Sequence, residues 1–311
     1  MRLPIAILAL LSLCSFSSAQ VEVESPPMGG NVISISSGNS LLAPSFVHPD
    51  SFNGSISQFV DQGNGQWVIS FVNPGFLTNQ FDAANYPLYY LEVKSPGTYQ
   101  GAYYDIISST TNSVTVEGVQ SGSLSIGMEI CIRKHFTIED FFKAAEGSII
   151  PGTIFLQFFY NNNLAIPLFW TGSFWTSDFV TNDNNLPIYP GQGFLGSFGQ
   201  PYTFAVSGYV KQTPTIVPIY NNGINLVGTI SPVNLTFTDL NPLDQMRQGQ
   251  DILVTYQNGA SLSINKVYFH GGDKFTSDFL NDEQTDPVPA NLPFVVSAGS
   301  DFNWILPSPI N

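Results

Sequence analysis

Charged side chains are scarce in this sequence. Only 10% of the 311 residues are Asp, Glu, Lys or Arg, whereas about 25% is usual in soluble proteins. The 23 acidic residues outnumber the 9 basic ones, which gives a net charge of −14 at neutral pH. Such a chain repels nucleic acid phosphates and anionic lipid head groups, so neither is expected as a partner. The hydrophobic share of 43% excludes a disordered chain, and the length suffices for about two domains.

Cysteine is nearly absent. The sequence has Cys14 and Cys131 alone, and Cys14 lies in a segment that we expect to be removed. A single remaining cysteine cannot form an intrachain disulfide, so the fold must be stabilised by its core. Cys131 lies in a predicted strand over 128–133, where we expect it to pack as a small buried hydrophobic residue.

Long hydrophobic runs are missing after the first residues. Arg2, the apolar run 5–13 and the small residues Ser17 and Ala19 are typical of a secretory signal peptide over 1–19 that is cleaved after Ala19. This apolar run is too short to span a bilayer, and no later run is long enough, so no membrane span is expected. The predicted location is secreted or in the cell envelope, either the periplasm or the cell surface.

Helical patterns are also rare. Short alternating runs rich in aromatic and β-branched residues are broken by Gly, Pro and Asn, as in an all-β sandwich or barrel. Tyr202, Phe204 and Val206 alternate with smaller residues, which predicts that the three large side chains share one strand face. The one predicted helix is 138–146, with Thr137 as its cap and Asp140 as the partner in a capping box.

The chain repeats itself at a distance of 100 residues. Thr-Ser-Asp-Phe occurs at 176–179 and at 276–279, and the alternating segment 202–206 corresponds to 302–306 in the same strand phase. A shared phase is informative because a slip of one residue would turn the apolar face outward. We therefore predict an all-β fold of two duplicated β-sandwich or barrel-like domains with little helix, over 28–207 and 208–307.

The first of these domains is longer than the second. The segments at 38–42 and 223–227 correspond with an offset of about 185 rather than 100 residues, which predicts an insertion near 57–134. The insertion contains four strand candidates, "YYLEV", "YYDIISS", "SVTVEG" and "MEICIRK". Four consecutive strands are enough for a small β-barrel or meander.

The repeated Thr-Ser-Asp-Phe has two interpretations. In the first, Asp178 and Asp278 accept backbone N–H groups two residues further on and fix a turn, while Phe179 and Phe279 are buried and attach the turn to the core. In the second, nearby Asp, Asn and Glu side chains bind calcium, although neither segment has the residue order of a known calcium loop. We expect the first, with no metal and no cofactor.

Several segments in order resemble a known family. These are "GNSLLAPSF", "YYDIISSTTNSVTVEG", "ICIRKHFTIEDFF", "YPGQGFLGSFG" and "GINLVGTISPV". Together they resemble an uncharacterised family of secreted, signal-peptide-bearing bacterial β-rich proteins. The second copy departs from the family pattern, because Leu292-Pro293-Phe294 replaces the Gly-x-Gly-Phe of 191–194. The resemblance implies a fold and export, and it implies no activity.

A catalytic constellation is missing from the sequence. His48, His135 and His270 lie far apart and away from any Gly-x-Ser-x-Gly turn, so each is expected to be a surface or turn histidine rather than part of a triad or a zinc site. Glycoside hydrolysis needs two facing carboxylates. The candidates in the insertion are Glu92, Asp105, Glu117 and Glu129, and these are more typical of the polar faces of strands.

Aromatic residues suggest a binding surface instead. Trp170, Trp175, Tyr209 and Tyr220 are the candidate ligand-binding residues, because sugar-binding faces stack rings on sugars, although core packing competes for the same rings. The sequence thus predicts an exported, non-catalytic envelope or extracellular interaction protein. The alternative is a polysaccharide-binding or polysaccharide-degrading protein. The expected partners are a glycan or other envelope proteins, and the expected state is a monomer.

Overall fold

The computed structural model describes residues 27–309 apart from 161–163, 222 and 260. The predicted signal peptide over 1–19 lies outside these residues. Strands dominate the described chain and helices are few, so the predicted all-β class is confirmed. None of the described helices is long and apolar enough to cross a membrane.

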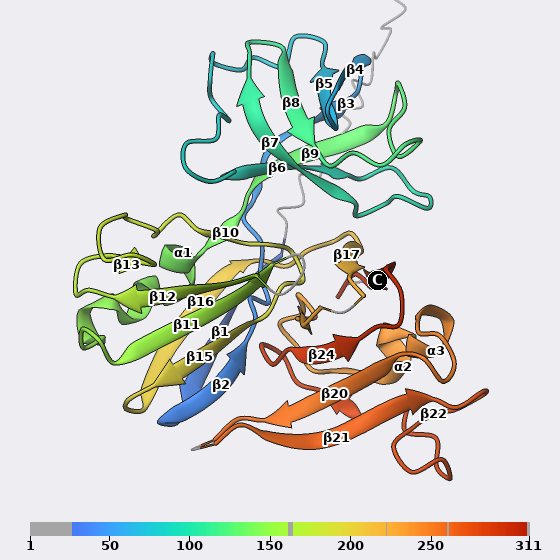
Figure 1. Ribbon diagram of the computed structural model, residues 1–311. Coiled ribbons are helices and arrows are strands. Elements are labelled where there is room, and N and C mark those ends of the chain that lie inside the picture. Colours follow the sequence, from blue (N-terminus) through green and yellow to red (C-terminus); the bar gives the residue numbers. More distant parts are fainter. Residues whose placement is uncertain (1–26, 161–163, 222, 260, 310–311) are drawn as a thin grey trace, which may run out of the picture.

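The first unit is built on a five-stranded antiparallel sheet, shown at the left of Figure 1. Its strands in spatial order are β2 (Gly38–Leu42), β15 (Phe194–Phe198), β11 (Ile154–Tyr160), β12 (Leu164–Trp170) and β13 (Trp175–Thr176). Two strand pairs complete the unit, β1 (Met28–Ile35) with β16 (Tyr202–Tyr209) and β10 (Phe136–Thr137) with β14 (Pro187–Ile188). Along β16, Tyr202, Phe204 and Val206 are buried while Thr203, Ala205 and Ser207 are exposed, so the predicted phase of this strand is confirmed.

The second unit has the same spatial order of strands. Its five-stranded sheet runs β18 (Asn225–Val227), β24 (Phe294–Ser297), β20 (Ile252–Gln257), β21 (Ser263–His270) and β22 (Phe275–Thr276). Its two strand pairs are β17 (Thr215–Ile219) with β25 (Phe302–Leu306) and β19 (Leu235–Thr236) with β23 (Pro287–Val288). Each of these strands takes the place of one strand of the first unit.

A half-barrel lies above the two sheets in Figure 1. Its seven strands in order are β3 (Asp50–Ser55), β9 (Glu129–Lys134), β6 (Tyr89–Val93), β7 (Tyr103–Ser109), β8 (Ser113–Glu117), β5 (Gln66–Ser70) and β4 (Gln58–Gly63). The four strands expected in the inserted segment are β6 to β9, and β3 to β5 join them. The first and last strands of the order, β3 and β4, are consecutive in the chain, so the sheet curls back on itself around its own hydrophobic core. Cys131 is buried in β9, as predicted, and burial raises the pKa of its thiol to about 12.

The predicted helix is shorter than expected. α1 covers Ile138–Phe142 and continues as the 3-10 helix Lys143–Ser148. The predicted capping box is present, because the Thr137 hydroxyl accepts the Asp140 N–H and the Asp140 carboxylate accepts the Thr137 N–H. The short helices α2 (Phe237–Leu240) and α3 (Pro242–Gln245) lie in the second unit, and α2 begins with the same capping box.

The Thr-Ser-Asp-Phe loops confirm the predicted turn and correct the predicted Phe burial. The carboxylate of Asp178 accepts the N–H groups of Val180 and Thr181, and that of Asp278 does the same in its own loop. Phe179 and Phe279, however, are each 66% exposed. Both have a positive φ, of 64° and 62°, and this turns each ring onto the outer face of its sheet. There the rings stack on Phe169 and Phe269, with centroids 5.0 and 5.2 Å apart.

A buried ionic cluster joins the half-barrel to the linker between the two units, residues 210–214. Glu92 on β6 accepts a hydrogen bond from the linker residue Lys211, with 2.7 Å between Oε1 and Nζ, and both side chains are buried. Arg133 on β9 lies 3.7 Å from Glu92 and forms a 2.6 Å ion pair with Asp50. Burial alone would raise the pKa of Glu92, but the charges of Lys211 and Arg133 hold it below its usual value, so the glutamate is ionised. These contacts fix the half-barrel on the linker.

A glycine allows the half-barrel to pack closely against the linker. Gly101, in the turn between β6 and β7, has a φ of +84°, and a Cβ there would lie 2.1 Å from the carbonyl oxygen of Pro214. Its own carbonyl accepts the N–H of Ile216. Only a residue without a side chain lets the half-barrel approach the linker this closely.

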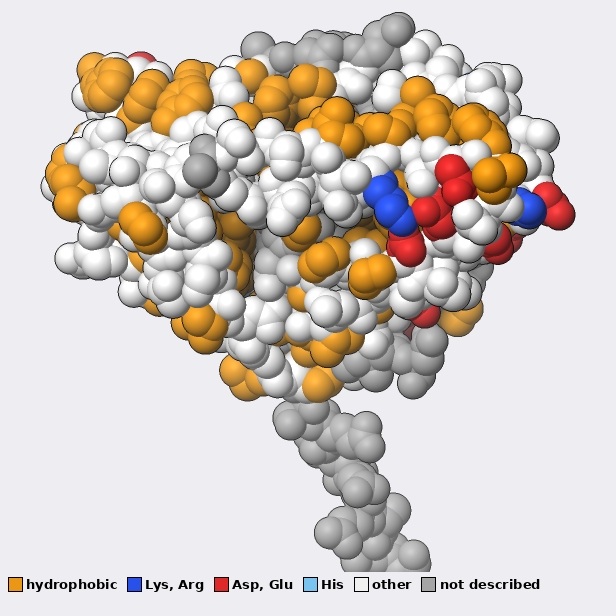
Figure 2. All heavy atoms as spheres, turned by 90° about the horizontal axis from the view of Figure 1, so that it is seen from below, with side chains coloured by type: hydrophobic (Ala, Val, Ile, Leu, Met, Phe, Trp, Pro, Cys, Tyr) orange, Lys and Arg blue, Asp and Glu red, His pale blue; other side chains and the backbone are white. Residues whose placement is uncertain are grey.

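The two units also contact each other directly. The Asn258 side chain accepts the N–H of Leu41 at 2.9 Å and donates to its carbonyl at 3.0 Å. The segment after β20 is thus attached to the edge strand β2. The backbones of Gly191 and Gly228 are joined by a hydrogen bond. Figure 2 shows that charged side chains occupy little of the face seen from below and gather on one side of it, in keeping with the composition.

Several carboxylates make the fold sensitive to acid. Burial would raise the pKa of Asp140, but hydrogen bonds from His48 and Thr137 and the charge of Lys134 hold it well below its usual range. Burial would likewise raise the pKa of Asp50, but the charges of Arg133 and Lys94 hold it below its usual value. A carboxyl group whose pKa is lowered by folding stabilises the protein above its unfolded pKa, and this stability is lost as the pH falls through the folded value.

We therefore expect a melting temperature that is constant from neutral pH to about pH 5 and that falls progressively below about pH 4. Circular dichroism melts across this range measure it. The Asp140→Asn variant should be less stable than the parent near neutral pH, and the difference should shrink in acid. A parent melting temperature that stays constant to about pH 2 would contradict the prediction.

Candidate functional site

A cavity of about 770 Å³ lies where the half-barrel, the first unit and the second unit meet. The half-barrel contributes the start of β7 and the end of β8, the first unit contributes the loop after β14, and the second unit contributes β17, β18 and the loop between them. The volume is in the range of small-molecule sites, about 300–1,000 Å³. The lining includes the polar side chains of Tyr103, Asp105, Glu117, Tyr189, Gln192 and Tyr220.

Asp105 is held in the wall of this cavity by two side chains. His135 Nε2 lies 2.9 Å from its Oδ1, and the Tyr189 hydroxyl donates to its Oδ2 at 3.1 Å. The side chain of His135 is fully buried under the ring of Tyr90, at a centroid distance of 4.6 Å. With both oxygens of Asp105 engaged, its carboxylate has one orientation. His135 is thus a buried support of Asp105 and corrects the expectation of a surface or turn histidine.

Glu117 lies beside Asp105 at the end of one strand ladder. Ile106 on β7 pairs with Val116 on β8, and both side chains are buried inside the half-barrel. Asp105 and Glu117 are the next residues outward from this pair, so strand alternation places both side chains on the opposite face. Both line the cavity, where Glu117 is exposed and Asp105 is half-buried.

The aromatic residues of the lining are Tyr103, Tyr104, Phe159, Tyr189 and Tyr220. The rings of Tyr103 and Tyr189 lie nearly parallel, with centroids 6.4 Å apart and 21° between their planes. Burial and the charge of Asp105 raise the pKa of Tyr103, which therefore remains a neutral hydrogen-bond donor. Tyr220 lines the cavity from the second unit.

Two amide side chains fix the loops that carry these tyrosines. The Gln192 side chain accepts the Tyr189 N–H at 3.0 Å and donates to the carbonyl of Phe159. The Asn225 side chain accepts the Tyr220 N–H at 2.9 Å and donates to the Tyr220 carbonyl at 3.0 Å. A side-chain amide therefore holds the backbone of Tyr189 and that of Tyr220.

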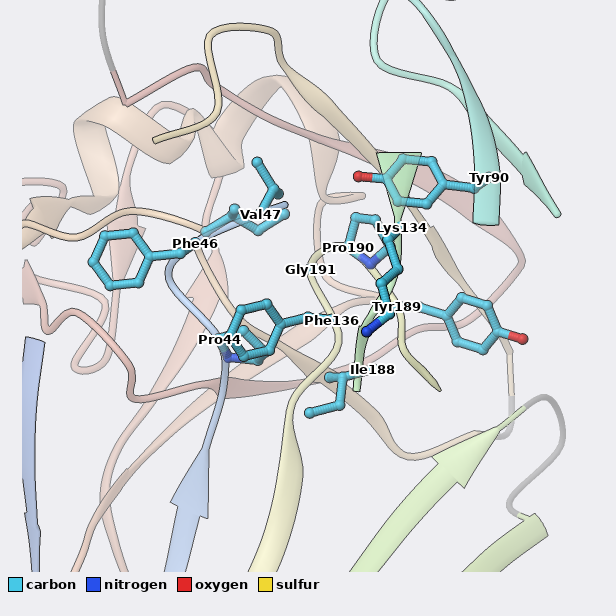
Figure 3. Close-up of a pocket in the computed structure, with 11 residues that line it drawn as sticks. Pro44, Phe46, Val47, Tyr90, Lys134, Phe136, Ile188, Tyr189, Pro190 and Gly191 are labelled. Carbon is cyan, nitrogen blue, oxygen red and sulfur yellow. The ribbon is translucent and has the colours of Figure 1, made fainter. Parts of the chain in front are cut away.

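A smaller cavity lies behind the loop after β14. Its volume is about 10 Å³, which is room for about one water molecule. Phe46, Phe136 and Ile188 are among the residues that line it, and the ring of Tyr189 points away from it (Figure 3). The residues around this cavity pack against the loop, and the cavity is too small for an organic ligand.

The predicted binding residues do not form one surface. Trp170 and Trp175 are only 4% and 0% exposed, so they are core residues of the first unit and not sites for an external ligand. Their indole rings lie 5.3 Å apart, and Trp175 packs on Phe142 at 5.0 Å. Tyr209 is half-buried on β16, opposite Met28 of β1. Tyr220 alone of the four lines the cavity.

The structure separates the four candidate carboxylates into three places. Glu92 belongs to the buried ionic cluster. Glu129, on β9, accepts a hydrogen bond from Ser55 on the exposed side of the half-barrel. Only Asp105 and Glu117 converge on the cavity.

The other two histidines contact side-chain or backbone oxygens outside the cavity. His48 Nε2 lies 3.0 Å from Asp140, and His270 contacts the carbonyls of Met246 and Gly272. Within the described part of the chain, no group of three or more His, Cys, Asp or Glu side chains is arranged to hold a metal ion.

Sequence reasoning did not single out Tyr103 or Tyr189. They are 86 residues apart by their numbering, in a half-barrel strand and in a loop of the first unit. No local pattern indicated that the half-barrel would lie over that loop. The comparisons with known proteins found no matching family model, no matching curated protein and no matching solved structure.

Proposed function

We propose that the protein is an exported, non-catalytic binding protein whose central cavity holds a short oligosaccharide. The observation that carries the proposal is the cavity of about 770 Å³, in which Tyr103, Tyr189 and Tyr220 stand beside carboxylate and amide side chains. Rings stack on the apolar faces of sugars, and carboxylates and amides bond to hydroxyl groups. Export rests on the signal peptide predicted over 1–19 and on the resemblance to a secreted family.

We further infer that the two units arose by duplication. The matching spatial order of their strands and the two Asp-capped loops with a left-handed Phe support this inference. The cavity lies beside both units and the half-barrel, so a ligand would contact all three parts.

Binding is tested by isothermal titration calorimetry against a panel of neutral and charged oligosaccharides. We expect at least one to bind, and we expect Tyr220→Ala and Tyr103→Ala to weaken its binding roughly three- to tenfold, as the loss of one stacked ring does. Tyr209→Ala is the matched control, because Tyr209 lies on β16 and does not line the cavity. Equal weakening by all three variants, or no binding by the parent protein, would contradict the proposal.

A second candidate function is polysaccharide hydrolysis. The observation in its favour is that Asp105 and Glu117 both line the cavity from the neighbouring strands β7 and β8, since glycosidases use a pair of facing carboxylates. Incubating each bound oligosaccharide with the protein and measuring released reducing ends decides between the two. Release that is lost in Glu117→Gln would establish the enzyme, whereas binding without release supports the binding protein.

A further inference from the structure

The ionisable side chains that line the cavity are all acids or tyrosines. Asp105 and Glu117 are the acids, and no Lys, Arg or His occurs among the described residues of the lining. A ligand with phosphate, sulfate or carboxylate groups would meet negative charge without a compensating cation. The lining therefore selects against anionic ligands.

The cations of the half-barrel and of the linker are paired with acids outside the cavity lining. Lys134 bonds to Asp140 at 3.2 Å, and Lys211 and Arg133 are held by Glu92 and Asp50. His135 is fully buried behind Asp105, and its Nε2 lies 2.9 Å from the Asp105 carboxylate. No ion pair within the described chain neutralises Glu117. Asp105 and Glu117 thus line the open space without a Lys or Arg partner.

Aromatic rings beside this charge favour the same kind of partner. Tyr103 and Tyr189 line the cavity close to Asp105, which accepts the Tyr189 hydroxyl, and an aromatic ring attracts a cation. Carboxylates together with tyrosine faces are the groups that recognise an ammonium ion in proteins.

We propose that Asp105, Glu117 and the rings of Tyr103 and Tyr189 form an ammonium subsite, so that the ligand is an oligosaccharide with free amino groups. This inference rests on the proposed function for the sugar and adds the amine. Asp105 is the fixed acceptor, because His135 and Tyr189 set its orientation, and Glu117 is the solvent-facing acceptor at the mouth of the cavity.

The test compares three trisaccharides of equal length and linkage by titration calorimetry: β-1,4-linked glucosamine, its N-acetylated form and β-1,4-linked glucose. At a pH that keeps the amine protonated, the glucosamine trimer should bind about tenfold or more tightly than the other two. Its affinity should fall with added salt, because part of the attraction is electrostatic.

Variants then assign the residues. Glu117→Gln should remove most of the preference for the glucosamine trimer while the glucose trimer binds as before. Glu129→Gln, an acid on the same half-barrel outside the cavity, should leave the preference intact. Melting curves show whether each variant is folded.

The outcomes separate the two proposals. Equal binding of all three trimers, unchanged by Glu117→Gln, would overturn the ammonium subsite and leave the oligosaccharide proposal standing. If no trimer binds but spermidine does, and Glu117→Gln weakens that binding, the ammonium subsite stands and the oligosaccharide proposal falls. If neither spermidine nor any trimer binds, both are overturned.

Discussion

Replacing Glu92 with glutamine should destabilise the protein by about 3–5 kcal/mol, the cost of removing one partner from a buried ion pair. Lys211 would keep its ammonium group buried against the carbonyls of Thr213 and Pro214 without a counter-charge. Arg133 would retain Asp50 and lose the nearby Glu92 carboxylate. The glutamine amide is an uncharged acceptor and cannot neutralise Lys211 or Arg133. The substitution should therefore weaken the contact between the half-barrel and the linker.

Urea unfolding followed by fluorescence and circular dichroism measures this effect. Trp67 lies in the half-barrel, Trp170 and Trp175 in the first unit and Trp304 in the second, so every part has its own fluorophore. Glu129→Gln is the control, because this exposed acid on β9 should change stability by only about 0.5 kcal/mol or less. Coincident unfolding curves for Glu92→Gln and the parent protein would disprove the structural role of the cluster.

Trp175→Ala should cost about 3–5 kcal/mol, as large-to-small changes at a fully buried aromatic residue do. The Trp175 ring lies between Phe142 and Trp170, and no rearrangement of β13, a two-residue strand, would fill the space it leaves. The same loop holds the control, because Phe179 is exposed and lies on the outer face.

Thermal and urea unfolding of the two variants give the comparison. Phe179→Ala removes an exposed ring from the surface, so its effect should lie within about 0.5 kcal/mol of zero. If the two variants were equally destabilised, the assignment of Trp175 to the core and of Phe179 to the surface would be wrong.

Local patterns predicted the elements of this fold well. Alternation along 202–206 gave the buried face of β16, and Thr137 with Asp140 gave the cap of α1. These features depend on residues that are neighbours in sequence. The Asp178 turn was predicted for the same reason, because its bonds reach only two and three residues ahead.

Long-range arrangement was not accessible in the same way. Phe179 was expected in the core because it is a large ring after a capped turn, but its positive φ turns it outward, and φ at one residue leaves no mark in a Thr-Ser-Asp-Phe pattern. Trp170 and Trp175 were expected on a binding surface but lie in the core. Sequence alone does not distinguish a core tryptophan from one on a binding surface. The cavity depends on how the half-barrel lies over the loop of Tyr189, and Gly101 and Lys211 fix that arrangement through contacts distant in sequence.

The order of strands has a consequence for how the chain folds as it is synthesised. The half-barrel takes all its strand partners from 50–134, so it can fold as soon as this segment is available. The first unit must wait, because β1 and β2 at its beginning pair with β16 and β15, which come more than 150 residues later. During that interval the edges of β1 and β2 lack their partners, and such unpaired edges are prone to association between chains. The slow step, and the one most prone to aggregation, should therefore be the pairing of β1 and β2 with β16 and β15 after the half-barrel has folded.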